Sequence, residues 1–290
     1  MLKGRTKFIK GYLFATPLLV VLALAVLFPA VHNLGIAFFK HNFMRSSWEF
    51  VGLQNFMKLL GSAYFWNSFK VTLIWVIGNI CLQLVIGLAI ALALNSIIHF
   101  RGLFTGILLI PWISSFVVVA ILFLWIYHPQ LGVLNDLLLR LGLIDAPIAW
   151  LASPKLAQLS LIIANTWKFF PLVMITLFAG LQDVSLELVE AARVDGANRR
   201  QTFKMVVLPT ILPAISTAVL LSTIWAYNSF TLPIIMTGGG PLRATEIFGL
   251  FIFKQAFDAF DFGAAAAASI ILFAQILLVI VLYLRVVERD

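Results

Sequence analysis

The sequence predicts an all-α integral membrane protein with six membrane-spanning helices, and two observations carry this prediction. Charged residues make up 11% of the 290-residue chain and apolar residues 62%, whereas a soluble domain carries about 25% charged residues. Long windows with little or no charge recur along the chain, and each is long enough to cross a bilayer as a helix of about 20 residues. The expected spans are residues 12–32, 71–97, 103–127, 158–181, 211–235 and 263–284.

The chain begins with a basic head that resembles the start of a signal peptide. The apolar run that follows is longer than the about 7–15 residues of a signal-peptide core, and no clean A-x-A site follows it, so we expect it to remain as the first span. The head favours a cytoplasmic N-terminus because it carries four basic residues and no acid: Lys3, Arg5, Lys7 and Lys10. Six spans then place both termini in the cytoplasm, and the connections 33–70, 128–157 and 236–262 outside.

Composition also limits the chemistry of the chain. We interpret the formal net charge of +8 as a sign of membrane topology and lipid contact, not of nucleic-acid binding. Cys81 is the only cysteine, so no internal disulfide is expected, and we expect it to be a small buried residue of the second span. The four histidines are scattered without metal-ligand spacing, so no metal site is expected.

Nothing in the sequence indicates catalysis by this chain. No phosphate-binding loop of the form G-x-x-x-x-G-K-[ST] occurs, and no sequence-local catalytic motif is found. The run Gly238-Gly239-Gly240-Pro241 lacks a following Lys-Ser/Thr pair, and we interpret it as a tight turn at the outer end of the fifth span. We therefore expect a protein that is not an enzyme and binds no cofactor of its own.

Two outer connections contain helical patterns. Residues 49–70 mix aromatic residues with scattered lysines, which predicts a helix lying on the membrane surface before the second span. Residues 131–143 predict another short helix, in which Asp136 and Arg140 pair at i,i+4 spacing and Gly142 stops the helix. We interpret both as interfacial packing elements.

The most informative connection is the inner one, residues 182–210. Ser185 can cap a helix whose first turn carries Glu187, Gly196 interrupts that helix, and a second helical stretch covers Gln201–Val207. This predicts a helix–turn–helix outside the bilayer, with Ala191 and Ala192 on its surface. A small-residue face surrounded by charge suits insertion into a partner's groove, while an ordinary solvated loop is the alternative.

This connection also carries a long pattern with fixed spacing. Glu190-Ala191-Ala192 is followed after three residues by Gly196, and Leu208-Pro209 closes the pattern. The arrangement resembles the EAA motif of binding-protein-dependent permeases of ABC importers. The adjacent Asp195 also fits, and Val206 stands where the family pattern has Ile, which is a conservative departure.

Further segments resemble the sugar-permease branch of that family, which includes the maltose and glycerol-phosphate permeases. They span nearly the whole chain and are FVGLQNFMKLL (50–60), FRGLFTGILLIPW (100–112), LGVLND (131–136), TWKF (166–169) and MTGGGPLRATEIFGLFIFKQAF (236–257). The resemblance implies a permease of the type I ABC importer fold in a prokaryotic cytoplasmic (inner) membrane. It makes residues 1–290 a single permease domain.

The resemblance also implies partners. ATPase subunits, which use ATP and Mg²⁺, would dock on residues 182–210 as a coupling helix. Glu190 would pair there with a basic residue, and Gly196 would allow the sharp turn. An extracytoplasmic solute-binding protein and a second permease subunit would complete the importer, although one sequence leaves heterodimer and homodimer open. The expected solute is a sugar, oligosaccharide, polyol or glycerol-phosphate-like compound.

A permease must replace the water that a polar solute loses in the bilayer, so polar and aromatic side chains inside spans are the pathway candidates. Thr223, Tyr227 and Thr231 would share one face of the fifth span. Lys168 is either a cavity or gate residue, or a lysine that reaches outward or pairs with a partner's acid; for the others the alternative is interhelical hydrogen bonding. The candidates are Asn165, Trp167, Lys168, Thr223, Trp225, Tyr227, Asn228 and Thr231.

Two features complete the expectations. Pro171, Pro213 and Pro233 are expected to kink their helices, since each removes a backbone donor. Six spans would equally suit an ion-gradient-driven secondary transporter or channel, or a membrane scaffold. The expected spans contain no Asp or Glu for ion coupling, and the 182–210 pattern would have no purpose in a secondary transporter or channel.

Overall fold

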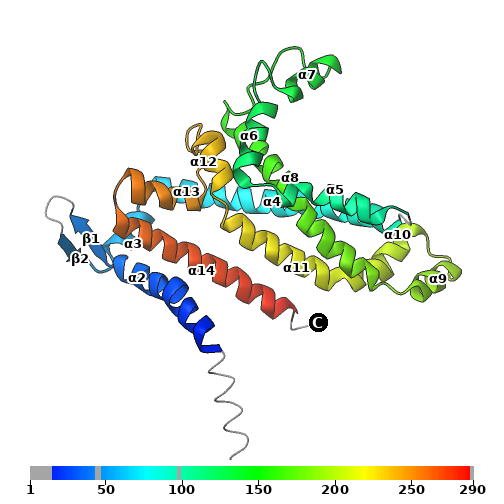
Figure 1. The fold of residues 1–290 in the computed structure, drawn as a ribbon, viewed down its shortest axis with the longest axis horizontal. Helices are drawn as coiled ribbons and strands as arrows, with labels where there is room; N and C mark the ends of the chain where they lie inside the picture. The colour runs from blue at the N-terminus through cyan, green and yellow to red at the C-terminus, as the bar shows by residue number, and fades with distance from the viewer. Residues whose placement is uncertain (1–14, 43–46, 97–98, 288–290) are drawn as a thin grey trace, which may run out of the picture. The chain divides into compact units, whose positions relative to one another are not determined.

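The computed structural model describes residues 15–42, 47–96 and 99–287 (Figure 1). The basic head, with the first residues of the expected span 12–32, lies outside the described residues. The chain divides into two compact units, Met1–Ser62 with Ile252–Ala274 and Ala63–Phe251 with Gln275–Asp290.

Within the described residues, five helices are long and apolar enough to cross a membrane, and a sharply bent helix pair makes a sixth candidate if it counts as one span. The number of spans therefore agrees with the prediction when the bent pair is counted once. The five helices are Ala15–Ile36, Ala63–Ser96, Pro154–Gln182, Arg199–Tyr227 and Phe262–Tyr283, and the pair is Arg101–Ile113 with Phe116–Ile126.

The first unit holds the first span and a small hairpin. A π-helical turn, η1 (Ala23–Leu27), leads into α2 (Phe28–Ile36). Strands β1 (Phe39–Asn42) and β2 (Ser47–Phe50) then pair antiparallel, with Phe39 opposite Phe50. The hairpin is a short exception to the all-α prediction.

A short helix, α3 (Gln54–Leu60), follows the hairpin. The amide of Asn55 donates to the carbonyls of Ala37 (2.8 Å) and Phe39 (3.0 Å) and so fastens α3 to the chain before it. The expected surface helix over 49–70 is therefore wrong as one element. Its first residues form β2, and its last residues from Ala63 onward belong to the long helix α4.

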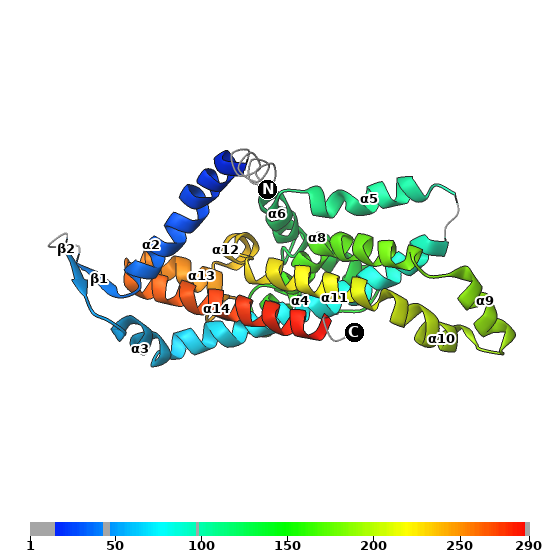
Figure 2. The ribbon, with the colours of Figure 1, turned by 90° about the horizontal axis from the view of Figure 1, so that it is seen from below.

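The second unit is built around α4 (Ala63–Ser96) and α8 (Pro154–Gln182), with α11 (Leu208–Tyr227) packed against both (Figure 2). Small residues let these helices approach closely. A Cβ at Gly87 would lie 2.8 Å from Cγ1 of Val173. One apolar core joins the three helices, and it includes Ala91, Leu94, Met174, Leu177, Ile211 and Ala218.

The expected span 103–127 is not one continuous helix. Helices α5 (Arg101–Ile113) and α6 (Phe116–Ile126) meet at 93°. The backbone is extended at Ser114 and Ser115, with ψ of 143° and 142°, and Pro111 inside α5 supplies no backbone donor. Hydropathy alone does not reveal the break because the run is apolar on both sides of it.

The expected span 211–235 is corrected at both ends. Helix α10 (Arg199–Thr202) and the π-helical turn η2 (Phe203–Val207) run on into α11, so the long helix begins at Arg199. It ends at Tyr227, and residues of the expected outer end form a separate helix, α12 (Thr231–Thr237). Pro233 therefore lies in α12 and kinks no long span.

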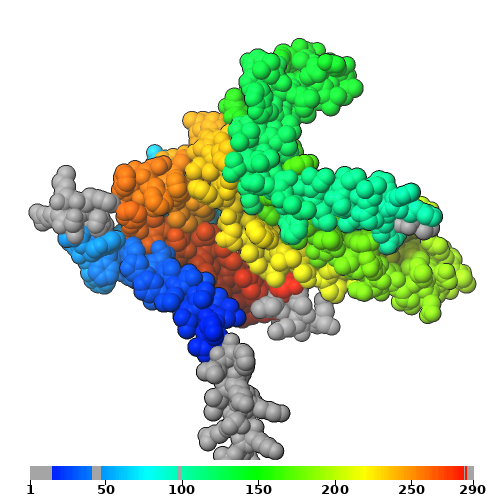
Figure 3. Space-filling model, viewed as in Figure 1, coloured from blue at the N-terminus to red at the C-terminus, as the bar shows by residue number. Residues whose placement is uncertain are grey.

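The remaining elements lie between and after the spans. Helix α7 (Val133–Arg140) contacts α6 and projects away from α4, α8 and α11 (Figure 3). The expected Asp136–Arg140 ion pair is present at 3.0 Å. Helix α13 (Phe248–Phe253) and the π-helical turn η3 (Lys254–Asp258) precede α14 (Phe262–Val287). Cys81 is exposed on the surface of α4, so the expectation of a buried thiol is wrong.

Candidate functional site

The connection between α8 and α11 has the expected helix–turn–helix form. Helix α9 (Leu186–Val194) starts at Ser185, whose hydroxyl accepts from the Leu188 amide at 3.5 Å. It ends before Gly196, which adopts a φ of +86° that side chains disfavour. Residues 185–207, from this cap to the end of η2, are called the elbow below.

A second cap starts the helix after the turn. The side chain of Asn198 accepts from the Gln201 amide (2.9 Å), and the Gln201 side chain accepts from the Asn198 amide (2.8 Å). This reciprocal capping box satisfies two backbone donors at the helix start. The elbow is thus a defined, capped structure, not an irregular loop.

Most side chains of the elbow are exposed. No residue of α9 is buried, and large apolar side chains of the elbow are exposed, with Leu186 76% and Val194 87% exposed. Glu190, Ala191 and Asp195 are exposed as well. Exposed apolar side chains grouped on one small element are typical of a surface that binds a partner. The other residues of the EAA-like pattern are the half-buried Ala192 and Leu208 and the exposed Gly196 and Pro209.

Lys168 lies beside the break between α5 and α6. Its side chain is 3% exposed, and its ammonium donates to the carbonyls of Trp112 (3.2 Å) and Ser114 (2.5 Å). It also lies 4.3 Å from the centre of the Phe116 ring, a favourable cation–π position. Lys168 therefore satisfies carbonyls at the C-terminal end of α5, where α5 breaks from α6 and helical partners are missing.

Asn165 belongs to a buried polar cluster between α4 and α8. Its amide donates to Oδ1 of Asn79 at 2.7 Å, and Nε2 of Gln83 approaches the same oxygen at 3.3 Å. Asn79 in turn donates to the carbonyl of Trp75 at 2.8 Å. The sequence analysis missed Asn79 and Gln83, although two amides at i,i+4 spacing inside an apolar run are a visible signal.

The candidates after residue 220 do not form one face. Thr223 and Tyr227 are buried in α11, whereas Thr231 opens the separate helix α12. Trp225 is 44% exposed, and Asn228 is exposed with its amide on the carbonyl of Ile224 at 2.9 Å. These two side chains remain accessible on the surface of the chain. Trp167 is half-buried in α8, with its ring against Phe123.

The segment between α12 and α13 also contains a buried acid that the sequence analysis overlooked. Glu246 is 1% exposed, and its carboxylate accepts from Arg243 (3.2 Å) and Ser68 (3.4 Å). The tight turn expected at the glycine run is present, with Gly238 and Gly239 at φ of +58° and +89°. This segment is therefore held against α4.

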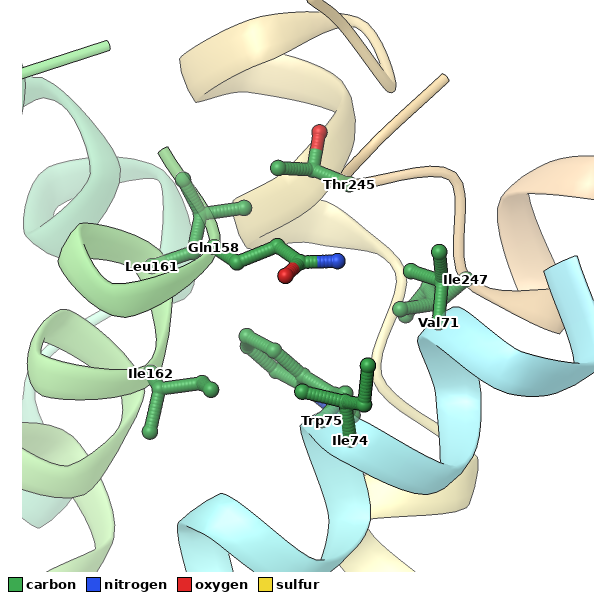
Figure 4. A pocket seen from close by; sticks show the side chains of 8 residues that line it. All are labelled: Val71, Ile74, Trp75, Gln158, Leu161, Ile162, Thr245 and Ile247. Carbon is green, nitrogen blue, oxygen red and sulfur yellow. The ribbon is translucent and has the colours of Figure 1, made fainter. Parts of the chain in front are cut away.

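A small cavity lies under this segment, between α4 and α8 (Figure 4). Trp75 and Gln158 face into it, with Thr245 above them and Ile247 to one side. Its volume of about 10 Å³ is close to the smallest space that holds one water molecule. It cannot hold a sugar, so this cavity is not a solute site.

Comparison with known families decides what the chain is. The family described as binding-protein-dependent transport system inner membrane component matches residues 83–290, which include α8, the elbow and α11. This chain belongs to that family. It is therefore a multi-pass membrane permease, a non-catalytic component of a binding-protein-dependent ABC transport system.

Individual relatives extend over nearly the whole chain. The trehalose/maltose transport system permease protein MalF of Thermococcus litoralis is 34% identical over 276 residues, covering 95% of this chain and 92% of its own length. The sulfoquinovosyl glycerol transport system permease protein SmoG of Agrobacterium fabrum is 31% identical over 281 residues, covering 95% and 89%.

A solved structure shares the fold. A chain of a bacterial ABC transporter involved in the import of the acidic polysaccharide alginate aligns with a TM-score of 0.84 at 22% identity, covering 99% of this chain and 98% of that one. The predicted fold, a type I ABC importer permease, is confirmed.

Proposed function

We propose that this chain forms, with a second permease subunit, the membrane pathway of an ATP-driven importer that takes up a carbohydrate. The elbow is the observation that carries this proposal. It presents the EAA-like pattern on a capped helix with exposed apolar side chains, a surface suited to a partner's groove. A heterodimer of two related permeases is the arrangement that we propose.

The elbow would receive the ATPase subunits, which use ATP and Mg²⁺ while this chain binds no cofactor. Glu190 is exposed on α9, where it can pair with a basic residue of the ATPase. Gly196 allows the turn that holds the two elbow helices apart. Closure of the ATPase dimer would then move the elbow as a lever and switch the spans between inward-facing and outward-facing states.

The carbohydrate assignment rests on relatives and on side-chain chemistry. The relatives named above carry the words trehalose, maltose and sulfoquinovosyl glycerol in their names. Trp225 and Asn228 offer an aromatic ring and an amide on the exposed surface of this chain, and such groups replace the water around a polar solute. The buried candidates would instead hold the helices that carry the pathway.

We further propose that both termini lie in the cytoplasm of a prokaryotic cell and that residues 1–290 act as one permease domain. The elbow then faces the cytoplasm, as docking of an ATPase requires, and the connection with α7 faces outward, toward a solute-binding protein. The basic stretch 193–204 agrees with this orientation, because basic residues favour the cytoplasmic side.

Uptake by the Glu190→Lys variant tests the proposal. The importer is assembled in proteoliposomes with its ATPase subunits and solute-binding protein, and labelled maltose, trehalose and glycerol phosphate are offered with ATP inside. We expect ATP-dependent uptake by the wild type that survives collapse of ion gradients, and none by Glu190→Lys, although the variant inserts normally. Glu49→Lys, an exposed acid on β2, is the charge-matched control. Normal uptake by Glu190→Lys would contradict the assigned role.

A further inference from the structure

A cavity lies beneath the elbow, lined by residues near the end of α4 and by the first residue of α5. Its volume is about 460 Å³, within the range of about 300–1,000 Å³ of ligand pockets. Helix α9 forms one wall, through the exposed Leu186, the half-buried Val189 and the exposed Arg193, which recur at helical spacing. The opposite wall belongs to the membrane-spanning helices α4 and α8.

The charged side chains that line this cavity are all basic. Arg101 and Arg193 both line it, and no acid is among its lining residues. Arg101 is held in place, since it donates to the carbonyl of Asn95 at 3.3 Å and lies 5.3 Å from the centre of the Phe178 ring. Arg193 is exposed, and no described residue pairs with its side chain. Guanidinium groups match phosphate oxygens in a two-pronged geometry, so the cavity suits a phosphate group.

Most of the remaining lining is apolar, with Asn95 and Gln182 as its other polar residues. The apolar side chains distinguish an amphiphile from a soluble anion. The apolar side chains come from the ends of α4, α8 and η2, from the link between α8 and α9, and from α9 itself. They include Leu92, Leu181, Val184, Leu186, Val189 and Val207. An inorganic phosphate would leave this surface without an apolar partner. A lipid headgroup would place its phosphate on the arginines and its glycerol and first acyl carbons against the apolar wall.

We propose that this cavity binds the phosphate headgroup of an anionic phospholipid from the cytoplasmic leaflet. The proposal rests on the orientation proposed above, which puts the elbow in the cytoplasm, where the membrane surface carries anionic lipid. Basic pockets between membrane-spanning helices on that side are suited to such headgroups. Because α9 forms one wall, the bound lipid would also brace the elbow against the membrane-spanning helices.

Lipid binding to the purified full-length chain tests this site without any ATPase present. Binding of acyl-labelled phosphatidylglycerol is titrated in detergent, with phosphatidylcholine and inorganic phosphate as competitors. Each basic residue near an anionic lipid contributes about fivefold in affinity, so we expect Arg193→Gln to bind about fivefold more weakly and Arg101→Gln with Arg193→Gln about 25-fold more weakly. Arg200→Gln removes an exposed charge of the same segment outside the cavity, and we expect it to bind as the wild type does.

A second variant separates the cavity from charge alone. Val189→Trp fills the cavity and keeps both arginines, and we expect it to lose phosphatidylglycerol binding while it stays monodisperse. Two results would overturn the site. One is equal weakening of phosphatidylglycerol binding by Arg193→Gln and Arg200→Gln. The other is displacement of the bound lipid by millimolar phosphate but not by further phosphatidylglycerol. Since the titration involves no transport, its failure leaves the ATP-dependent uptake assay as an independent test of the proposed function.

Discussion

The α4–α8 pair and the elbow lie in the same unit, but they differ in the burial of their polar side chains. Asn79, Asn165 and Lys168 are buried and bonded to groups of this chain. In the elbow, Glu190 and Asp195 are exposed, and no residue of α9 is buried. Burial with internal partners marks polar residues that hold the helices together, while exposure marks those available to another molecule.

This contrast divides the pathway candidates. Asn165, Lys168 and Thr223 belong with the buried group, whereas Trp225 and Asn228 belong with the exposed group. Substitutions in the buried group should therefore lower stability first, and substitutions in the exposed group should change transport with little change in stability. The variants below test this division of the candidates.

Lys168→Met should give the largest loss of stability. It removes the charged donor of the carbonyls of Trp112 and Ser114, and a hydrogen bond to a charged group contributes about 1.5–3 kcal/mol. Since both bonds are only partly buried, a total loss of about 2–4 kcal/mol is expected. Thermal unfolding in detergent measures the effect. Lys155→Met, at an exposed lysine near the start of the same helix, should leave the midpoint unchanged, and an equal midpoint for both variants would refute the assigned position of Lys168.

Asn79→Leu should lower the free energy of unfolding by a smaller amount, about 1–2 kcal/mol, because it removes the acceptor shared by Asn165 and Gln83. The double variant Asn79→Leu with Asn165→Leu should be more stable than the sum of the two single losses predicts, since both partners of one bond are removed. Strict additivity in a double-mutant cycle would show that the two amides do not interact.

Gly196→Ala should destabilise the conformation of the elbow turn by about 1 kcal/mol, because residue 196 has a φ of +86°, which is disfavoured for a residue with a side chain. Nothing lies within 4 Å of the added methyl group, so no clash complicates the result. The turn connects the two elbow helices, and we therefore expect slower uptake with a nearly unchanged unfolding midpoint. The variant Gly142→Ala, with a φ of +66° and open space after α7, is the matched control and should transport normally.

Asn228→Ala should change stability least, by less than about 0.5 kcal/mol, because the side chain is exposed and bonds only to its own helix. If the amide contacts the solute, loss of one hydrogen bond raises the KM for uptake about fivefold. Thr217→Ala is the control, since Thr217 is also exposed on α11 and bonds to its own helix. An unchanged KM in both variants would remove Asn228 from the pathway.

The sequence was informative where a signal is local. Windows with little or no charge located the spans approximately, the caps Ser185 and Gly196 defined the elbow, and i,i+4 spacing predicted the Asp136–Arg140 pair. Each of these depends on neighbours along the chain. The family pattern was equally accessible, because its residues and spacing lie in one short stretch.

The sequence was uninformative where the answer depends on packing. Ser114 and Ser115 break the third span, but the position of Lys168, more than fifty residues later, became clear only when α8 was seen beside that break. The exposure of Cys81 likewise depends on which side of α4 meets α8. Neither hydropathy nor spacing specifies that side in a helix that is apolar all round.

Cysteine labelling of α9 tests the central claim most directly. Ala191→Cys is made in a Cys81→Ser background, because Cys81 is itself exposed, and vesicles of known sidedness are treated with a membrane-impermeant maleimide. The account predicts labelling only from the cytoplasmic side, and protection when ATPase subunits are bound. Labelling from the outer side, or labelling that bound ATPase subunits do not reduce, would contradict it.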